Sequence, residues 1–408
     1  MLSPSSLEME AMRVMHDSVQ WNKSLGKLVS VVFIGGVLGG CAASPQWPWV
    51  FAPPVANAPP NQQQSYPPIR QTVVTPPPVG GNTPTQQPPV ATTPRQPVNS
   101  VGLRGDYANY PAMRQFIGKM NNQHGFDIAF LEQTFSGVQR DKEALTKAGA
   151  PTEGQVWRAY RPIFLTEERI SGGVDFWNRH AALLDAATRQ YGVDTEYLVA
   201  IIGVETQYGK NTGKHNTLQA LTTLGFDFPR RASFYQKELE QFLLLSREEK
   251  VRPQIFNGSY AGAMGLGQFI SSSYRSYAVD GNRDGKRDLW SPQDAIPSVA
   301  NYFAKNGWKR GTGVAVPAYV AGGGYASIAE TNPKKPSRTL AELAAKGVRP
   351  QGAINSAKVS LIKLEGTTDE YWVGGENFYA ITRYNPSVKY AMAVHQLAQE
   401  IRKRKFGF

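Results

Sequence analysis

The sequence predicts a mainly α-helical protein of the α+β class, with a small sheet inserted among the helices. Apolar residues recur three and four positions apart in several segments, which is the spacing of an amphipathic helix. Between residues 314 and 383 the pattern changes to short β-type runs separated by glycine and proline. The stretch 42–105 is rich in proline, glutamine and threonine and has few charges, so the folded part is expected over 106–408.

The expected helices follow in chain order. The first contains Phe116, Ile117 and Met120, and the next begins in the run 156–160. Further helices are expected over 173–190, 194–209, 238–248, 295–305 and 389–403, and strands over 358–363 and 377–382. These elements divide the folded part into a core at about 160–310, a β subdomain at about 311–385 and a C-terminal helix at about 386–405.

Glu205 is an acid at a position where the helical pattern predicts an apolar side chain. It continues the apolar face of Ile201 and Ile202, in a helix expected to begin after Asp194 as N-cap and to stop at Gly209. Burial raises the pKa of a carboxyl group and keeps it protonated near neutral pH, which a general acid requires. Glu205 is therefore the candidate catalytic acid.

Two other acids and an arginine pair bear on this interpretation. A structural ion pair between Glu205 and Arg230 or Arg231 is the alternative to catalysis. A hydrolase normally needs a second carboxylate, for which Glu238 and Glu240 are candidates. Their amphipathic stretch favours a solvated face for both.

The loop 280–291 has the ligand spacing of an EF-hand calcium site. Oxygen-bearing side chains occupy loop positions 1, 3, 5 and 9, glycine occupies position 6, and position 7 offers its backbone carbonyl; these residues are Asp280, Asn282, Asp284, Asp288, Gly285 and Lys286. Position 12 is Ser291 where a glutamate is usual, so calcium binding is expected to be weakened or completed by Asp294 or water. The alternative is a charged loop that holds no ion. Either way, the loop is expected to be structural.

The stretch 259–270 is rich in glycine and alanine, which allow a backbone to approach a ligand closely. Ser259 and Gln268 offer hydrogen bonds suited to sugar hydroxyls or amides. Close helix packing is the alternative explanation of such a stretch.

The net charge of +12 and the pI near 9.6 favour an anionic partner but do not choose among nucleic acid, anionic lipid and an acidic polymer. The sequence has no zinc-finger spacing, Walker A loop, dinucleotide glycine run or His-Glu-x-x-His motif. It therefore predicts neither a zinc site nor a nucleotide site.

The single cysteine, Cys41, ends an apolar run that follows Lys23 and Lys27 and is too short to span a bilayer. This pattern resembles a bacterial lipoprotein signal over 1–41, in which Cys41 is lipidated; a buried helix ending by chance in Gly-Gly-Cys is the alternative. The residues before Lys23 look unlike a signal, which a true start further along the chain would explain. Ala42 suggests sorting to the outer membrane, and 42–105 is expected to be a disordered tether.

Several strings, in order along the chain, closely resemble the membrane-bound lytic murein transglycosylase B family. They are 203–209 (Gly-Val-Glu-Thr-Gln-Tyr-Gly), 228–231, 260–265, 277–280, 298–303 and the region 371–385. The resemblance implies a lysozyme-like helical core that carries the catalytic acid and a calcium loop, flanked by an α domain and a small β domain.

The resemblance also implies roles for individual residues. It places the catalytic glutamate at Glu205 and the substrate contacts at Tyr160, Arg230, Arg231, Ser259, Met264, Gln268, Tyr302 and Tyr384. Each tyrosine can alternatively be a core aromatic with a satisfied hydroxyl. Ser291 departs from the family, whose calcium loop ends in an acidic residue.

The activity implied is that of a peptidoglycan lytic transglycosylase in cell-wall turnover and remodelling. Glu205 would protonate the oxygen between N-acetylmuramic acid (MurNAc) and N-acetylglucosamine (GlcNAc), then accept the proton of the muramoyl C6 hydroxyl, giving 1,6-anhydro-MurNAc without water. No cofactor is expected for catalysis, and Ca²⁺ is expected only as a structural ion. The alternatives are a lysozyme-type hydrolase and a non-catalytic peptidoglycan-binding lipoprotein.

The partners implied are peptidoglycan glycan strands, an outer-membrane lipid anchor and cell-wall synthesis proteins, with no nucleic acid. The expected location is the periplasmic face of the outer membrane, reached through Cys41.

Overall fold

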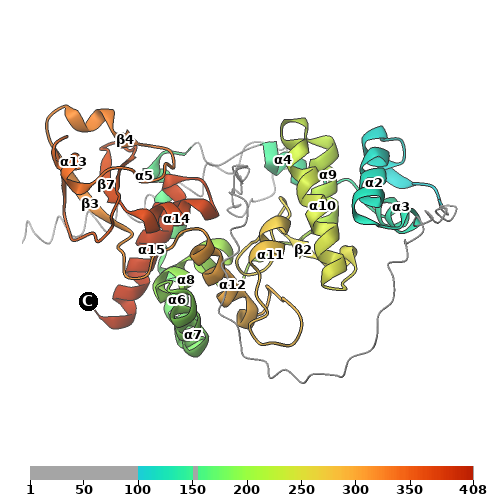
Figure 1. The fold of residues 1–408 in the computed structure, drawn as a ribbon, viewed down its shortest axis with the longest axis horizontal. Coiled ribbons are helices and arrows are strands. Elements are labelled where there is room, and N and C mark those ends of the chain that lie inside the picture. The colour runs from blue at the N-terminus through green and yellow to red at the C-terminus, as the bar shows by residue number, and fades with distance from the viewer. Residues whose placement is uncertain (1–99, 150–154, 408) are drawn as a thin grey trace, which may run out of the picture. The chain divides into compact units, whose positions relative to one another are not determined.

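The computed structural model describes residues 100–149 and 155–407, in which helices predominate and accompany a small sheet (Figure 1). Cys41 and the expected tether lie outside these residues. The described helices include none with both the length and the apolar character needed to cross a membrane.

The helices before the five-stranded sheet fall into three groups along the chain. The first group comprises η1 (Gly105–Tyr107), α2 (Pro111–His124), α3 (Ile128–Ser136) and α4 (Lys142–Gly149). The second comprises α5 (Trp157–Phe164), α6 (Glu167–Arg179), α7 (Ala181–Tyr191) and α8 (Thr195–Thr206). The third comprises β1 (His215–Asn216), α9 (Thr217–Asp227), η3 (Pro229–Arg231), α10 (Ala232–Glu248), η4 (Pro253–Ile255), β2 (Asn257–Gly258), α11 (Ser271–Tyr277) and α12 (Pro292–Lys305). Helices α9 and α10 lie side by side (Figure 1).

The sheet follows α12 and has the strand order β4-β6-β7-β3-β5. Its elements are β3 (Ala315–Val320), η5 (Gly324–Ser327), β4 (Ala329–Glu330), α13 (Leu340–Ala344), β5 (Val348–Pro350), β6 (Ser360–Leu364) and β7 (Glu370–Gly374). Only the β4–β6 pair is parallel; β6 pairs with β7 in the register Ile362 to Trp372. Leu343, Val348 and Leu361 belong to an apolar cluster of the sheet and its short helix.

Two expected elements are wrong. The segment 173–190 is not one helix, because His180 ends α6 and precedes α7. The run 377–382 is not a strand but part of α14 (Glu376–Tyr384), which is followed by α15 (Val388–Phe406). Phe378, Ile381 and Tyr384 are buried at spacings of three, so the helical period decides over the β-type composition.

Helix α8 forms the centre of the helical core, where α6, α7 and α15 contact it. Every residue from Thr195 to Thr206 is buried, so α8 has no solvent face and Glu205 does not lie on a single apolar stripe. The expected end at Gly209 is also wrong. Helix α8 ends at Thr206, and Gln207 and Tyr208 adopt left-handed backbone conformations with φ of 51° and 62°.

The turn after α8 is fixed by Tyr208, whose hydroxyl donates a hydrogen bond to the carbonyl oxygen of Arg169 at 2.7 Å. The Tyr208 ring fills the space beside Gly203, where an added Cβ would lie 2.4 Å from the phenolic oxygen. Glycine at 203 thus permits the packing that turns the chain away directly after Glu205.

Gly203→Ala should therefore destabilise the protein by about 1–3 kcal/mol, the usual cost of overpacking a core. Gly118→Ala on α2 is the matched control, because an added Cβ there meets nothing within 4 Å. The Gly118→Ala variant should gain up to about 1 kcal/mol of stability, because alanine has a higher helix propensity than glycine. The free energies of unfolding of both variants, measured in urea, test this prediction, and equal values would contradict the packing argument.

Candidate active site

Glu205 lies in the last turn of α8 and is only 1% exposed. Its Oε1 atom accepts a hydrogen bond from the hydroxyl of Tyr390, on α15. Its Oε2 atom is buried and has no hydrogen-bond partner in the described part of the chain. The carboxyl group thus has one oxygen held in place and the other without a hydrogen-bond partner among the described residues.

Burial raises the pKa of Glu205 well above its usual value, and the Tyr390 hydrogen bond opposes this rise without cancelling it. Within the described residues, Glu205 makes no ion pair with Arg230, Arg231 or any other cation. The group is therefore held in the protonated, uncharged form that a general acid needs.

The stability of the protein should depend on pH through Glu205. Its folded-state pKa lies above the ordinary value of 4.5, so unfolding releases a proton at any pH between these two values. The folded state should therefore lose stability as the pH rises from 4.5 toward the folded pKa, by about 1.4 kcal/mol per pH unit.

Glu205→Gln removes this ionisation. The variant should match the parent in stability near pH 4 and exceed it increasingly toward pH 7, as measured by denaturant unfolding at several pH values. A stability difference independent of pH would show that Glu205 is ionised when folded.

The turn after α8 brings the glycine-rich segment to Glu205. The Thr206 hydroxyl donates to the carbonyl oxygen of Leu266 at 3.1 Å and accepts from the amide of Gly209 at 3.1 Å. The hydroxyl of Tyr384 donates to the carbonyl oxygen of Gly267. An added Cβ at Gly267 would lie 2.9 Å from that hydroxyl, so glycine allows the close approach.

Tyr302 and Tyr384 are neighbours in the core, with ring centroids 4.7 Å apart. Tyr384 lies within electrostatic range of Glu205: burial raises the pKa of Tyr384, and the Glu205 charge adds to the rise. The Tyr302 hydroxyl donates to the carbonyl oxygen of Arg383. Tyr160, on α5, is buried and interacts electrostatically with Tyr390. Each of these tyrosines also packs in the core, so its burial fits both a substrate contact and a core aromatic with a bonded hydroxyl.

Ser259, Met264 and Gln268 are buried in the segment between β2 and α11. The Ser259 hydroxyl accepts from the amide of Ala263 at 3.1 Å. The Gln268 side-chain amide donates to the carbonyl oxygen of Thr212 at 3.0 Å, and Gln268 itself has a left-handed φ of 49°. Met264 pairs with Phe269 through two backbone hydrogen bonds of 2.9 Å. These bonds hold the segment in a folded loop rather than a helix.

The two arginines lie in η3, between α9 and α10. The guanidinium of Arg231 lies 4.4 Å from the ring centre of Phe234, and its buried Nη2 atom has no hydrogen-bond partner in the described residues. Arg230 is exposed and lies 5.8 Å from the ring centre of Phe228. A buried cationic donor without a partner is suited to an anionic or carbonyl oxygen.

The expected solvated face for Glu238 and Glu240 is wrong. Glu238 is 4% exposed and accepts hydrogen bonds from the Ser272 amide at 2.9 Å and hydroxyl at 2.8 Å, so it caps the start of α11. Glu240 binds Lys119 and His124, which join α10 to α2. Both acids have structural partners.

The oxygen-rich loop after α11 folds as the EF-hand spacing predicts at its turn, where Gly285 has a φ of 87°. Asp280 accepts from the Gly285 amide at 2.8 Å, and Asp284 accepts from the Lys286 amide at 2.9 Å. The fully buried Asp294 accepts from the amides of Gly281 at 2.9 Å and Asp288 at 2.7 Å.

The donor set of this loop fits a hard cation, because it consists of carboxylate, amide and carbonyl oxygens. Across 100–149 and 155–407, no three His, Cys, Asp or Glu side chains converge closely enough to hold a metal. The Asp294 carboxylate instead organises the loop backbone. Ser291, at the twelfth position, precedes α12 as its N-cap and donates to the Gln293 side chain.

Tyr390 is the site residue that the sequence interpretation missed. It lies 185 positions from Glu205 in the chain. A signal was present: Tyr390 and Val394 share the buried face of α15, and a buried tyrosine hydroxyl usually needs a partner. The sequence could not identify that partner.

Comparison with known proteins places this geometry in a family. The model for the transglycosylase SLT domain matches residues 108–399. Membrane-bound lytic murein transglycosylase B of Escherichia coli (strain K12) is 45% identical over 315 residues, which cover 74% of this chain and 86% of the relative.

Solved structures agree. The E. coli lytic transglycosylase Slt35 in complex with calcium superposes with a TM-score of 0.69 at 44% identity, covering 74% of this chain and 96% of that one. SltB3 from Pseudomonas aeruginosa in complex with NAG-anhNAM-pentapeptide superposes with a TM-score of 0.63 at 32% identity, covering 71% and 79%. The mainly helical fold with its small sheet, the lysozyme-like core and the sequence identity lead to one conclusion: this chain belongs to the lytic murein transglycosylase family, whose members are lyases acting on peptidoglycan.

Proposed function

We propose that Glu205 is the catalytic acid and base with which this lytic transglycosylase cleaves the MurNAc–GlcNAc β-1,4 bond. The observation that carries the proposal is the buried carboxyl group, uncharged by burial, with Oε1 held by Tyr390 and Oε2 without a partner in the described residues. A protonated oxygen without a competing acceptor is available to donate to a glycosidic oxygen.

The reaction balances with one carboxyl group. Glu205 donates its proton to the glycosidic oxygen, the bond between that oxygen and MurNAc C1 breaks, and the N-acetyl group of the sugar stabilises the positive charge at C1. The ionised Glu205 then accepts the proton of the MurNAc C6 hydroxyl while the C6 oxygen bonds to C1. The product is 1,6-anhydro-MurNAc, no water is consumed, and Glu205 returns to its protonated form.

The surroundings of Glu205 favour this route over hydrolysis. Burial and Tyr390 account for the pKa shift, and no second carboxylate in the described residues contributes to it. The two acids considered for a second role, Glu238 and Glu240, are bonded to Ser272 and to Lys119 and His124. A hydrolase normally has a second carboxylate at the reacting carbon.

Mass spectrometry of digested peptidoglycan tests the proposal. The chain should release muropeptides lighter by one water than hydrolysis products, because the anhydro bond replaces the reducing end. A predominance of reducing-end products would support a lysozyme-type hydrolase instead, and intact glycan would support a non-catalytic binding protein.

The substrate contacts proposed are Tyr160, Arg230, Arg231, Ser259, Met264, Gln268, Tyr302 and Tyr384. Tyr384 and the segment of Ser259 to Gln268 meet through the Gly267 carbonyl next to the acid, which supports their place along one glycan path. The unpartnered Nη2 of Arg231 supports a contact with a carboxylate or carbonyl oxygen of the substrate.

A structural Ca²⁺ is proposed for the loop, held by Asp280, Asn282, Asp284, the Lys286 carbonyl and Asp288. Calcium binding should raise the melting temperature, since the folded state alone presents the site. Asp280→Asn should reduce the rise, while the anhydro products persist with a chelator present. Equal melting temperatures with millimolar CaCl₂ and with EDTA would contradict the calcium site.

A lipid anchor at Cys41 is proposed, with 42–105 as the tether from the outer membrane to the catalytic region 106–408. The name of the E. coli relative, membrane-bound lytic murein transglycosylase B, supports this location. Cys41→Ser should move the protein from the membrane fraction to the soluble periplasmic fraction, and an unchanged distribution would contradict the anchor. Association with cell-wall synthesis proteins is also proposed, as the resemblance to the family implies.

A further inference from the structure

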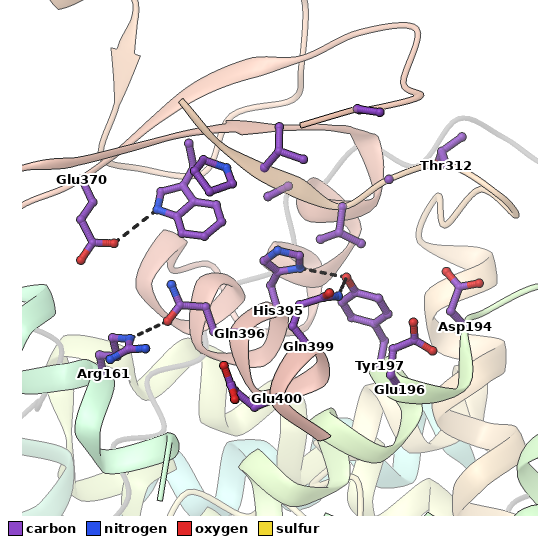
Figure 2. A pocket seen from close by; sticks show the side chains of 17 residues that line it. Arg161, Asp194, Glu196, Tyr197, Thr312, Glu370, His395, Gln396, Gln399 and Glu400 are labelled. Carbon is purple, nitrogen blue, oxygen red and sulfur yellow. Dashed lines mark hydrogen bonds between the residues drawn. The ribbon is translucent and has the colours of Figure 1, made fainter. Parts of the chain in front are cut away.

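A cavity lies at the opposite end of α8 from Glu205. Its volume is about 720 Å³, within the range of small-molecule and peptide sites. Its lining comes mainly from the start of α8, the strands β3 and β7, the segment 312–314 before β3 and the middle of α15, and Arg161 of α5 adds to it (Figure 2). Glu205 lies eleven positions after Asp194, the N-cap residue of α8, or about 16 Å along the helix axis. None of the substrate contacts proposed above lines this cavity.

Aromatic side chains form part of the lining. Trp372, on β7, is half-buried and lies edge-on to His395 on α15, with ring centroids 5.9 Å apart. Tyr197, on α8, stacks on the same histidine at 6.0 Å. Aromatic walls of this kind supply apolar contact to a ligand without losing much side-chain freedom.

Hydrogen bonds join three residues of this lining and fix the orientation of the uncharged His395 ring. Gln399 donates to the Tyr197 hydroxyl at 3.3 Å, and this hydroxyl contacts Nδ1 of His395 at 2.8 Å (Figure 2). Burial lowers the pKa of His395 to about 4, while a hydrogen bond with the backbone of Ala315 opposes the shift. The neutral ring therefore donates to Ala315 and accepts from Tyr197, so His395 adds no positive charge to the cavity.

Charged groups lie along the cavity. Asp194 and Glu196 lie at one end and Arg161 at the other, with His395, Gln399 and Glu400 between them (Figure 2). Glu196 is paired with Arg402 at 2.8 Å. Glu370, near Arg161, accepts hydrogen bonds from the indoles of Trp157 at 3.1 Å and Trp372 at 3.4 Å.

Asp194 has no such partner within the described residues. It is the N-cap residue of α8, yet its side chain makes no capping hydrogen bond and no ion pair among the described residues. Burial raises the pKa of Asp194 and the neighbouring Glu196 charge adds to the rise, while the charges of Arg402 and Arg310 oppose it. An ammonium group beside Asp194 would further favour the charged carboxylate.

At the other end of the cavity, Arg161 has hydrogen-bond donors without partners among the described residues. Its Nε atom donates to Gln396 at 2.6 Å, and its terminal nitrogens make no hydrogen bond or ion pair within the described ranges. A guanidinium presents paired donors that match a carboxylate.

We propose that this cavity binds the peptide carried by the glycan substrate, with a peptide ammonium group at Asp194 and the peptide carboxylate at Arg161. Trp372 and Tyr197 would contact the apolar side chains between the two charges. The inference rests on the proposed function, because a peptide attached to the glycan is the ligand of matching chemistry. The cavity would bind the peptide about 16 Å from Glu205 along the axis of α8, at the other end of the same helix.

Calorimetric titration of the full chain with a synthetic pentapeptide tests the proposal. The peptide has a blocked amino terminus, one lysine and a free carboxyl terminus. Acetylating the lysine or amidating the carboxyl terminus should each weaken binding at least tenfold, and 0.5 M NaCl should weaken the binding of the unmodified peptide.

Variants of the protein assign each end. Asp194→Asn should weaken binding of the unmodified peptide about tenfold and make lysine acetylation nearly without effect. Arg161→Gln should likewise weaken binding of the unmodified peptide about tenfold and make amidation of the carboxyl terminus nearly without effect. Asp185→Asn, an exposed acid of α7 outside the cavity, is the matched control and should bind as the parent does. Melting temperatures establish that each variant is folded.

Equal affinity for the acetylated and unmodified peptides would overturn the assignment, as would unchanged affinity in both folded variants. Absence of binding at millimolar peptide would also overturn it. Each of these results leaves the proposed function standing if anhydro products form from glycan, whereas the absence of those products would refute the function independently of peptide binding.

Discussion

Glu205→Gln should lower the rate of glycan cleavage by about 10²–10⁴-fold or more, the usual contribution of a positioned general acid. The amide keeps the shape of the side chain and still accepts the Tyr390 hydrogen bond, but it has no acidic proton to give to the glycosidic oxygen. Quantifying anhydro-muropeptides by chromatography and mass spectrometry measures the loss.

The fold should survive this substitution, because an uncharged carboxyl group is replaced by an uncharged amide. Glu365→Gln, an exposed acid in the β6–β7 connection, makes the same chemical change elsewhere and should cleave at the parental rate. A folded Glu205→Gln variant that releases anhydro products at the normal rate would exclude Glu205 as the acid.

Tyr390→Phe should lower the rate by about 10–100-fold while leaving the glycan products unchanged. The Tyr390 hydroxyl orients the carboxyl group and stabilises its ionised form, and a hydrogen bond to a charged group contributes about 1.5–3 kcal/mol. The phenylalanine ring keeps the packing of α15, so the loss isolates the hydroxyl.

The pH profile separates this role from a general loss of structure. The Tyr390 bond lowers the pKa of Glu205, so its removal raises that pKa further and keeps the acid protonated to higher pH. The alkaline limb of the rate profile should therefore move to higher pH in Tyr390→Phe. Tyr274→Phe, which removes a buried hydroxyl bonded to the Arg287 carbonyl, should leave the alkaline limb in place. An unshifted limb in Tyr390→Phe would indicate that the hydroxyl does not act through the carboxyl group.

Sequence patterns predicted the structure correctly where one short segment contained all the information needed. The motif around Glu205 and the apolar spacing predicted a helix there and a buried carboxyl group on it, and the structure has both. The run 377–382 shows the limit of such patterns. Its β-type composition suggested a strand, but the helical spacing of its buried residues decided the outcome.

The acids of α10 show a different limit. Glu238 and Glu240 occur in an amphipathic stretch, and only the fold brings α11 to one and α2 to the other. A sequence pattern gives the period of the exposed face, but the neighbours that cover that face come from distant parts of the chain.

The sequence by itself determined the family and the mainly helical class and predicted Glu205 as the acid, because these depend on residue types and spacings within short segments. The tertiary structure decided the state of that acid. Its burial on all sides of α8, its bond to Tyr390, the unpartnered Oε2 atom and the cavity at the other end of the helix all join residues far apart in the chain. A carboxyl group's charge is set by the dielectric and hydrogen bonds around it, and these exist only once the chain is folded.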